Sequence, residues 1–281
     1  MEEFVCDKEQ SLKEYTDAHY AQASFAWEYL LKNKEIKVNG KKVGENVTLQ
    51  LGDKIQYYLT KKQAEKPAFY VVYEDENVLV IDKESGVNSE AVFSALSRET
   101  QGKETRYFIH RLDRNTRGLM VFAKNEETER ALLNAFKERK VEKRYHAVCF
   151  GRFERQAGVL TAYLEKNEQK SFVKIFDKPK TGAEKIVTEY KVLETSGECV
   201  KAEILLHTGK THQIRAHLAH VGCPIVGDEK YGNHVKNREN KCSRQCLVAK
   251  FLRFSFEGKL AYLNEKIFRS RFDVELLKEK E

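Results

Sequence analysis

The segment HRLDRNTRGLMVFAKN, residues 110–125, places a single carboxylate, Asp113, among three arginines. Arg111, Arg114 and Arg117 surround this acid, and the segment contains no second one. Asp113 could cap the turn of an ion-paired loop at the entrance of a strand. Alternatively, it could be an anion that must stay ionised beside a polyanionic substrate, because a nearby guanidinium favours the charged form of a carboxylate. The segment alone leaves both interpretations open.

Two other residues could take part in chemistry. Tyr145 opens a strand-like run, and Arg215 lies in a helix-like segment after a glycine turn. Tyr145 could equally fill the core, and Arg215 could form a surface ion pair. The sequence shows no glycine-rich phosphate loop, nucleophilic serine motif or carboxylate pair at helical spacing. This excludes most ATP-dependent and cofactor chemistry.

The arginines are unevenly distributed along the chain. Residues 1–66 contain eleven lysines, eleven acids and no arginine, whereas all sixteen arginines lie at or beyond Arg98. The formal net charge of +7 therefore belongs entirely to the remainder of the chain. Because arginine forks match phosphates and stack on bases, this asymmetry indicates where a nucleic acid would bind. A solvated charged surface is the alternative.

The cysteines and the start of the chain bear on its surroundings. The six cysteines form no CxxC pair, and His217, His220 and Cys223 match no zinc spacing, so we expect no metal. The acidic start lacks an apolar signal core, and no run approaches membrane-spanning length. We therefore expect a cytoplasmic protein with free thiols and no contact with a membrane.

Residues 1–62 are predicted to form a small α/β module. A helix is expected within SFAWEYLLKNKEI, with Phe25, Tyr29 and Leu30 facing inward, followed by short strands with turns at VNGK and LGDK. The polar connector LTKKQAEKPA then indicates a boundary, and residues 67–281 form the second predicted domain.

The second domain is predicted to be rich in strands. A hairpin is expected in FYVVYEDENVLVIDKESG, a buried strand in GLMVFAK and an amphipathic helix in EETERALLNAFKERK. THQIRAHLAHVG is expected to be a helix capped by Thr211, with Ile214, Leu218 and Val221 inward. Successive strands with few helices predict an α+β fold with a mixed, largely antiparallel sheet and flanking helices.

Four ordered blocks of the chain carry a resemblance to a known family. These are VVYEDENVLVIDKESG, HRLDRNTRGLMVFAKN, EKRYHAVCFG and HTGKTHQIRAHLAHVGCPIVGDEKYG. In this order they resemble the RluA-type RNA pseudouridine synthases, over roughly residues 67–256. Residues 1–60 resemble, more weakly, the alpha-L RNA-binding motif often fused ahead of this domain, although they lack its arginines.

The resemblance implies a catalytic role for three residues. Asp113 corresponds to the catalytic carboxylate, Tyr145 to the active-site tyrosine and Arg215 to the arginine that keeps the carboxylate ionised. The fold implied is the pseudouridine synthase fold. The reaction is an isomerisation, which needs no cofactor, metal or energy source.

The resemblance also implies contacts with RNA. Arg111 would fill the space vacated by an extruded base, and Arg114 and Arg117 would contact phosphates. The remaining residues expected to bind RNA are His110, Lys210 and His212.

Several alternatives stay open at this level. Large-subunit ribosomal RNA is the first expected substrate and transfer RNA the second, while a catalytically silent RNA-binding protein of ribosome assembly is a different class. We expect a monomer. We also expect the second domain to hold the whole catalytic apparatus, so that losing the first module would mainly weaken binding of large structured RNA.

Overall fold

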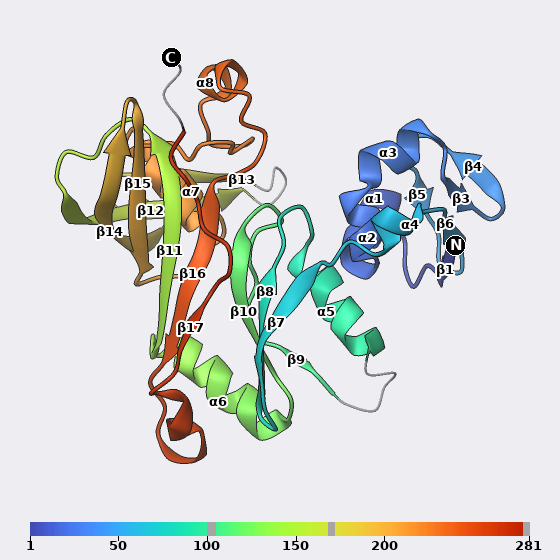
Figure 1. Ribbon diagram of the computed structural model, residues 1–281, viewed down its shortest axis with the longest axis horizontal. Coiled ribbons are helices and arrows are strands. Elements are labelled where there is room, and N and C mark those ends of the chain that lie inside the picture. Colours follow the sequence, from blue (N-terminus) through green and yellow to red (C-terminus); the bar gives the residue numbers. More distant parts are fainter. Residues whose placement is uncertain (100–104, 168–171, 278–281) are drawn as a thin grey trace. The chain divides into compact units, whose positions relative to one another are not determined.

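The computed structural model describes residues 1–99, 105–167 and 172–277 (Figure 1). The chain divides into two compact units, residues 1–115 with 120–129, and residues 116–119 with 130–281. Strand β10 (Arg117–Ala123) contributes residues to both units. The position near Pro67 at which we predicted a domain boundary falls inside the first unit.

The first sixty residues form a module with a hydrophobic core of its own. Its helices are α1 (Leu12–His19), α2 (Ala21–Phe25) and α3 (Trp27–Lys32). One sheet has the order β1-β6-β3-β4, and β2 pairs with β5. The strands are β1 (Glu2–Val5), β2 (Gln10–Ser11), β3 (Ile36–Val38), β4 (Lys41–Val43), β5 (Thr48–Leu49) and β6 (Lys54–Tyr57). The fully buried side chains of the core include Leu12, Leu30, Ile36 and Ile55.

The single helix predicted over residues 24–36 is wrong in its bounds. The chain forms three short helices instead, and the first starts at a capping box in which Ser11 and Glu14 exchange hydrogen bonds. This Ser-x-x-Glu pattern is a sequence signature of a helix N-terminus. Leu30 is buried as expected, whereas Tyr29 is exposed.

The rest of the first unit consists of short helices and a sheet. The predicted hairpin is confirmed, because β7 and β8 pair antiparallel around a turn in which Asp75 Oδ1 accepts hydrogen bonds from the amides of Asn77 and Val78. Strand β9 pairs antiparallel with the end of β10. The elements are α4 (Lys61–Ala64), β7 (Phe69–Glu74), β8 (Val78–Lys83), α5 (Ser89–Glu99) and β9 (Tyr107–Phe108).

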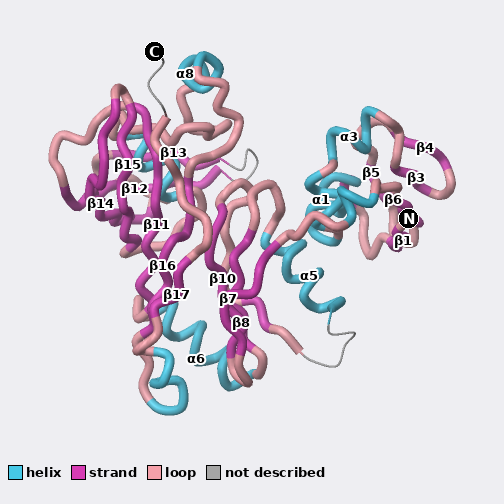
Figure 2. Tube along the Cα trace, viewed as in Figure 1, coloured by secondary structure: helices cyan, strands magenta, loops and turns pink. Residues whose placement is uncertain are grey.

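Strands dominate the second unit (Figure 2). They follow the order β13-β12-β14-β15-β11-β16, after which β16 pairs with β17 and with the start of β10. The β10–β16 pairing is parallel, and the pairings among β11 to β17 are antiparallel. The strands are β11 (Val141–Phe150), β12 (Ala157–Asn167), β13 (Phe172–Phe176), β14 (Glu184–Ser196), β15 (Cys199–Leu206), β16 (Leu247–Phe254) and β17 (Ile267–Arg269). The predicted α+β fold with a mixed, largely antiparallel sheet is therefore confirmed.

The helices include both longer helices predicted beyond residue 67. They are α6 (Glu126–Lys137), α7 (Gln213–His220), α8 (His234–Glu239) and the 3-10 helix η1 (Gly258–Leu263). Within the described ranges, no helix is both long and apolar enough to cross a membrane.

The start of α7 differs from the expectation that Thr211 would cap it. The residue at the cap is His212, whose backbone is left-handed with φ 53°, and its side chain does not cap the helix. Gln213 Oε1 instead accepts hydrogen bonds from the Lys210 amide and the Thr208 hydroxyl just before the helix. Ile214 and Leu218 are buried as predicted, whereas Val221 ends the helix and is exposed.

The parallel register of β10 and β16 depends on a glycine. Gly118 lies opposite Ala249 and has φ +115°, in the left-handed region. A Cβ atom at Gly118 would lie 2.3 Å from the Ala249 carbonyl oxygen and 2.6 Å from its nitrogen. Since both are backbone atoms held in the sheet, they cannot swing aside as a flexible side chain would.

We expect Gly118→Ala to lower the free energy of unfolding by roughly 2 to 5 kcal/mol, the sum of left-handed strain and overpacking. Gly222→Ala is the matched control, because φ is +78° there and no atom lies within 4 Å of the added carbon. That control should show only the strain, about 1 to 2 kcal/mol. Denaturant unfolding measures both, and equal losses would contradict the assigned contact.

Candidate active site

Asp113 lies in the loop between β9 and β10, in the first unit, and is half-buried. The residue before it is held by α5. Ser89, fully buried at the start of that helix, accepts a hydrogen bond from the Leu112 amide at 3.0 Å and donates one to the Leu112 carbonyl at 2.9 Å. This reciprocal pair fixes the backbone on the N-terminal side of Asp113.

The backbone on the other side of Asp113 is held by Lys83, a fully buried lysine at the end of β8. Its Nζ donates to the carbonyl oxygens of Glu84 at 2.9 Å, Val87 at 2.9 Å and Arg114 at 3.0 Å. Three carbonyl acceptors match the three donors of an ammonium group. Lys83 therefore ties the loop of Asp113 to the turn that follows the hairpin.

The charge of Lys83 depends on this environment. Burial lowers its pKa to about 7, and the negative charge of Asp113 is the strongest influence in the opposite direction. An ammonium that is removed from water favours a nearby anion. The carboxylate of Asp113 thus favours the charged form of Lys83.

The side chains around Asp113 have different environments. The Arg111 side chain is 67% exposed and pairs with Glu90 at 2.9 Å. His110 Nε2 accepts a hydrogen bond from the Val121 amide at 3.1 Å, which joins the loop to β10. Arg111 therefore lies where it can reach a ligand, whereas His110 has a structural contact within the protein.

Arg114 is expected to contact phosphate, and in the structure its guanidinium has three partners inside the first unit. Nη1 lies 3.3 Å from Asp17 Oδ2, Nη2 donates to the Ser24 carbonyl at 3.3 Å, and Nε donates to the Gly86 carbonyl at 3.1 Å. Two of these partners, Asp17 and Ser24, belong to the N-terminal module.

Tyr145 lies in the second unit, on β11, and its side chain is buried. It is opposite Ile204 on β15 and Ala249 on β16, and the β11–β16 register shifts between Arg144 and Tyr145. A shift of this kind re-aims the side chains beside it. In the same unit, the Arg117 guanidinium lies 4.6 Å from the centre of the Phe272 ring.

Arg215, on α7 in the second unit, forms a buried fork with Asp228. Nε lies 2.7 Å from Oδ2 and Nη2 lies 2.9 Å from Oδ1, and Asp228 is fully buried. Although burial opposes ionisation, the hydrogen bonds and charge of Arg215 hold the pKa of Asp228 below its ordinary value. This pairing fixes the orientation of the guanidinium.

The other residues expected to bind RNA on this side flank α7. His212 Nδ1 forms a 2.9 Å hydrogen bond with the Tyr231 hydroxyl. Lys210 forms an ion pair with Glu184 and is partly exposed. Both residues are partly exposed, and Lys210 carries the positive charge that a phosphate would attract.

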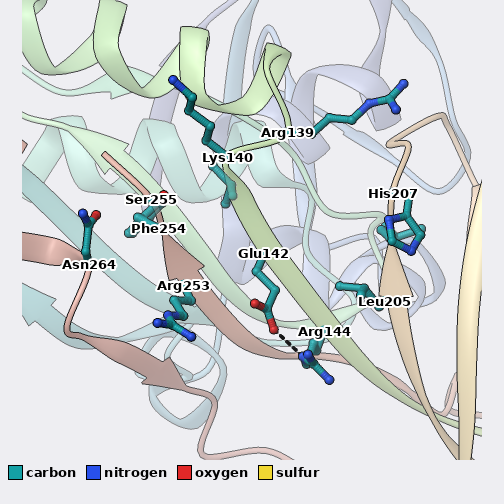
Figure 3. A pocket seen from close by; sticks show the side chains of 12 residues that line it. Arg139, Lys140, Glu142, Arg144, Leu205, His207, Arg253, Phe254, Ser255 and Asn264 are labelled. Carbon is teal, nitrogen blue, oxygen red and sulfur yellow. Dashed lines mark hydrogen bonds and ion pairs between the residues drawn. The ribbon is translucent and has the colours of Figure 1, made fainter. Parts of the chain in front are cut away.

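A cavity of about 450 Å³ in the second unit is lined by cationic side chains (Figure 3). Arg139, Lys140 and Arg253 are exposed on its walls. Lys140 pairs with Glu138 and Glu257, and Arg144, which also lines the cavity, pairs with Glu142 and Glu203. The exposed cations give the cavity a positive character that suits a phosphate group.

The predicted site residues are thus distributed over both units, with Asp113, His110, Arg111 and Arg114 in the first and Tyr145, Arg215, Arg117, Lys210 and His212 in the second. Sequence reasoning did not single out Lys83, Ser89 or Asp228. Asp228 lies within the last of the four blocks that resemble the family, and Lys83 within the first, so the resemblance could have identified both residues. Ser89 carried no comparable signal.

Comparison with known proteins identifies the family. Residues 63–220, which include Asp113, Tyr145 and Arg215, match the model of the RNA pseudouridylate synthases. Ribosomal large subunit pseudouridine synthase C of Rickettsia conorii is 34% identical over 232 residues, which cover 73% of this chain and 76% of that protein. Ribosomal large subunit pseudouridine synthase D of Buchnera aphidicola is 33% identical over 193 residues, or 63% of this chain and 58% of the relative.

A solved structure gives the same result. Human RNA pseudouridylate synthase domain containing 1 is similar with a TM-score of 0.59 at 27% identity, over 67% of this chain and 79% of that one. The chain therefore belongs to the RNA pseudouridylate synthase family, and the resemblance to its RluA-type members is confirmed. It is a pseudouridine synthase.

The Arg215–Asp228 pair predicts a pH-dependent stability. We expect Asp228→Asn to lower the free energy of unfolding by roughly 3 kcal/mol at pH 7, because a buried guanidinium loses its charged partner. The folded-state pKa of Asp228 is depressed, so its contribution is present above the unfolded-state pKa and is lost as pH falls through the folded-state value.

The difference between wild type and Asp228→Asn should therefore shrink as pH is lowered below about 4. Denaturant unfolding between pH 7 and pH 3 measures it. Asp177→Asn is the control, since that carboxylate is 84% exposed and pairs with His220 at the surface. A difference that stayed constant across this range would mean that Asp228 is not stabilised in its ionised form.

Proposed function

We propose that this chain isomerises specific uridines of large-subunit ribosomal RNA to pseudouridine, with Asp113 as the catalytic carboxylate and without a cofactor. The observation that carries the proposal is the intact HRLDRNTRGLMVFAK segment in a chain whose relatives are named for the large ribosomal subunit. That the chain acts as a monomer in the cytoplasm stays a prediction from its sequence.

The reaction breaks the bond between ribose carbon 1′ and uracil nitrogen 1 and forms a bond from the same carbon to uracil carbon 5. The proton on carbon 5 is lost and nitrogen 1 gains one, so substrate and product have the same atoms. No oxidant, reductant or energy source is required. A carboxylate suits this chemistry because it can add covalently or stabilise positive charge at the anomeric carbon, as carboxylates do in glycosidases.

Tyr145 and Arg215 have supporting roles in this proposal. The Tyr145 ring offers a face on which uracil can stack, and its phenol can assist the loss of the carbon 5 proton. The positive charge of Arg215 favours the ionised form of the catalytic carboxylate. Its fork with Asp228 supports this role, because an oriented guanidinium needs no reorganisation during the reaction.

The RNA contacts proposed follow from exposure and charge. The target uridine must be extruded from folded RNA, and the exposed Arg111 is suited to fill the vacated space. Arg117, His110, Lys210 and His212 remain proposed RNA contacts. Arg139, Lys140 and Arg253 of the basic cavity add phosphate contacts, which position the RNA without reading its sequence.

The decisive test is the release of tritium from ribosomal RNA labelled at uracil carbon 5. We expect the wild-type chain to release it and Asp113→Asn to lose release by at least about 1,000-fold, because the amide keeps the shape and lacks the charge. RNA affinity should stay within about threefold, and Asp177→Asn should behave as wild type.

Each other outcome identifies an alternative. Binding of ribosomal RNA without tritium release by the wild type would favour the catalytically silent assembly protein. Tritium release from transfer RNA but not from ribosomal RNA would identify transfer RNA as the substrate. Mapping pseudouridines in total RNA with and without the gene then locates the uridine.

The basic cavity generates a separate prediction. Arg253→Ala should weaken RNA binding several-fold and reduce the salt dependence of log Kd by about one unit, because one phosphate contact is lost. Arg238→Ala, an exposed arginine on α8 that does not line the cavity, is the matched control. Filter binding at several salt concentrations measures both variants. Equal losses of RNA affinity in the two would mean that Arg253 acts only through the overall positive charge of the protein.

A further inference from the structure

The residue that follows Asp113 connects its loop to the N-terminal module. The Arg114 guanidinium is held by the Asp17 carboxylate, the Ser24 carbonyl and the Gly86 carbonyl. These partners come from α1, from α2 and from the turn after β8, and Asp17 and Arg114 are 97 positions apart in the chain. Two of the three partners that anchor a side chain adjacent to Asp113 thus lie outside the segments that carry the family motifs.

The partners of Arg114 are also held by contacts with other residues of the module. The Asp17 side chain is only 13% exposed, and its Oδ1 accepts a 2.6 Å hydrogen bond from the Ser24 hydroxyl and an ion pair from Lys13. Its other oxygen, Oδ2, lies toward Arg114. A largely buried carboxylate needs such partners to stay ionised. Asp17 and Ser24 therefore form a socket shaped for a guanidinium group.

The backbone of Arg114 is held together with its side chain. Its carbonyl oxygen accepts hydrogen bonds from Lys83 Nζ and from the Gly86 amide, each at 3.0 Å. On the other side of Asp113, Ser89 fixes Leu112. Since neighbouring Cα atoms are about 3.8 Å apart, anchoring both neighbours leaves Asp113 little freedom to move.

The module contacts the rest of the first unit at a second place. Ser94 on α5 donates to the Ala18 carbonyl at 2.9 Å, and Arg98 donates to the His19 carbonyl at 2.9 Å. The Arg98 guanidinium also lies over the rings of Phe4 and Tyr20, at 5.3 and 5.7 Å. Helix α5 begins with Ser89, so the module supports both anchors of the Asp113 loop.

The charge of the module agrees with this role. Residues 1–66 hold equal numbers of lysines and acids and no arginine, whereas sequence-independent RNA binding depends on Lys and Arg side chains that neutralise phosphates. Lys13 and Arg114 both pair with Asp17. This acid of the module is therefore engaged with cations of the protein itself, as a positioning role requires.

We infer that the N-terminal module positions the loop of Asp113 through the Asp17–Ser24–Arg114 contact, with Asp17 as a positioning residue for the reaction. This inference rests on the proposed role of Asp113. It replaces the expectation that Arg114 binds phosphate and that the module serves only the binding of large RNA.

Positioning predicts a loss of rate rather than of affinity. Displacing a reacting group by about 1 Å can cost about 100-fold in rate. We therefore expect Arg114→Lys and Asp17→Asn each to lower the single-turnover rate constant at saturating ribosomal RNA by roughly 10- to 100-fold, with the RNA Kd within about twofold. Lysine keeps the charge of Arg114 but lacks the fork that reaches Asp17 and Ser24 together.

The combined variant Asp17→Asn with Arg114→Lys should lose no more than the worse single variant, because both changes remove the same contact. Asp7→Asn, an exposed acid of the same module, is the control and should keep the wild-type rate. Thermal unfolding reports whether Asp17→Asn stays folded. Should it unfold, Arg114→Lys decides alone, since it leaves the module untouched.

Two results would overturn the inference. Wild-type rates in both Arg114→Lys and Asp17→Asn would show that the module does not contribute to catalysis. The other result is weaker RNA binding by Arg114→Ala, with a shallower salt dependence and an unchanged rate at saturation. That result would mean that Arg114 contacts an RNA phosphate and does not position Asp113. Tritium release by the wild type is measured in the same assay, so a failure of the proposed function appears as no release at all and cannot be confused with either result.

Discussion

The buried ammonium of Lys83 is the contact on which the organisation around Asp113 depends. It joins the end of β8, the turn after it and the loop of Asp113 through three backbone carbonyls. Burying a cation costs free energy unless it is fully hydrogen-bonded, and this one also lies in the field of a carboxylate. The loop is therefore held by a buried amine whose charged form is favoured by the carboxylate of Asp113.

The second unit solves a similar problem with an ion pair. Arg215 is buried and would be unstable without Asp228, whose two oxygens meet it as a fork. Buried pairs contribute little net stability, but breaking one is costly, and their geometry is specific. The gain from such a pair is orientation. Both units thus place charged groups out of water and compensate them with well-defined partners, which is the condition for preorganised electrostatics.

The N-terminal module, as we infer, serves the site by holding the loop of Asp113. Its core is separate, its net charge is zero, and its acid Asp17 meets an arginine next to Asp113. A loop that carries a reacting group needs rigid support, and a neighbouring module can supply it. A module fused ahead of a catalytic domain can bind the RNA or support the catalytic loop. The partners of its charged side chains distinguish these two roles.

The sequence by itself determined the family, the class of reaction and most elements, because the blocks around Asp113, Tyr145 and Arg215 and the periodicity of β7, β8 and α6 are local patterns. It did not give the three helices within residues 12–32 or the left-handed His212 at the start of α7. Nor did it reveal the partners of Arg114. A local pattern shows that an arginine is available, but whether it meets phosphate or a carboxylate 97 residues away depends on how distant segments pack, and only the tertiary structure decides that.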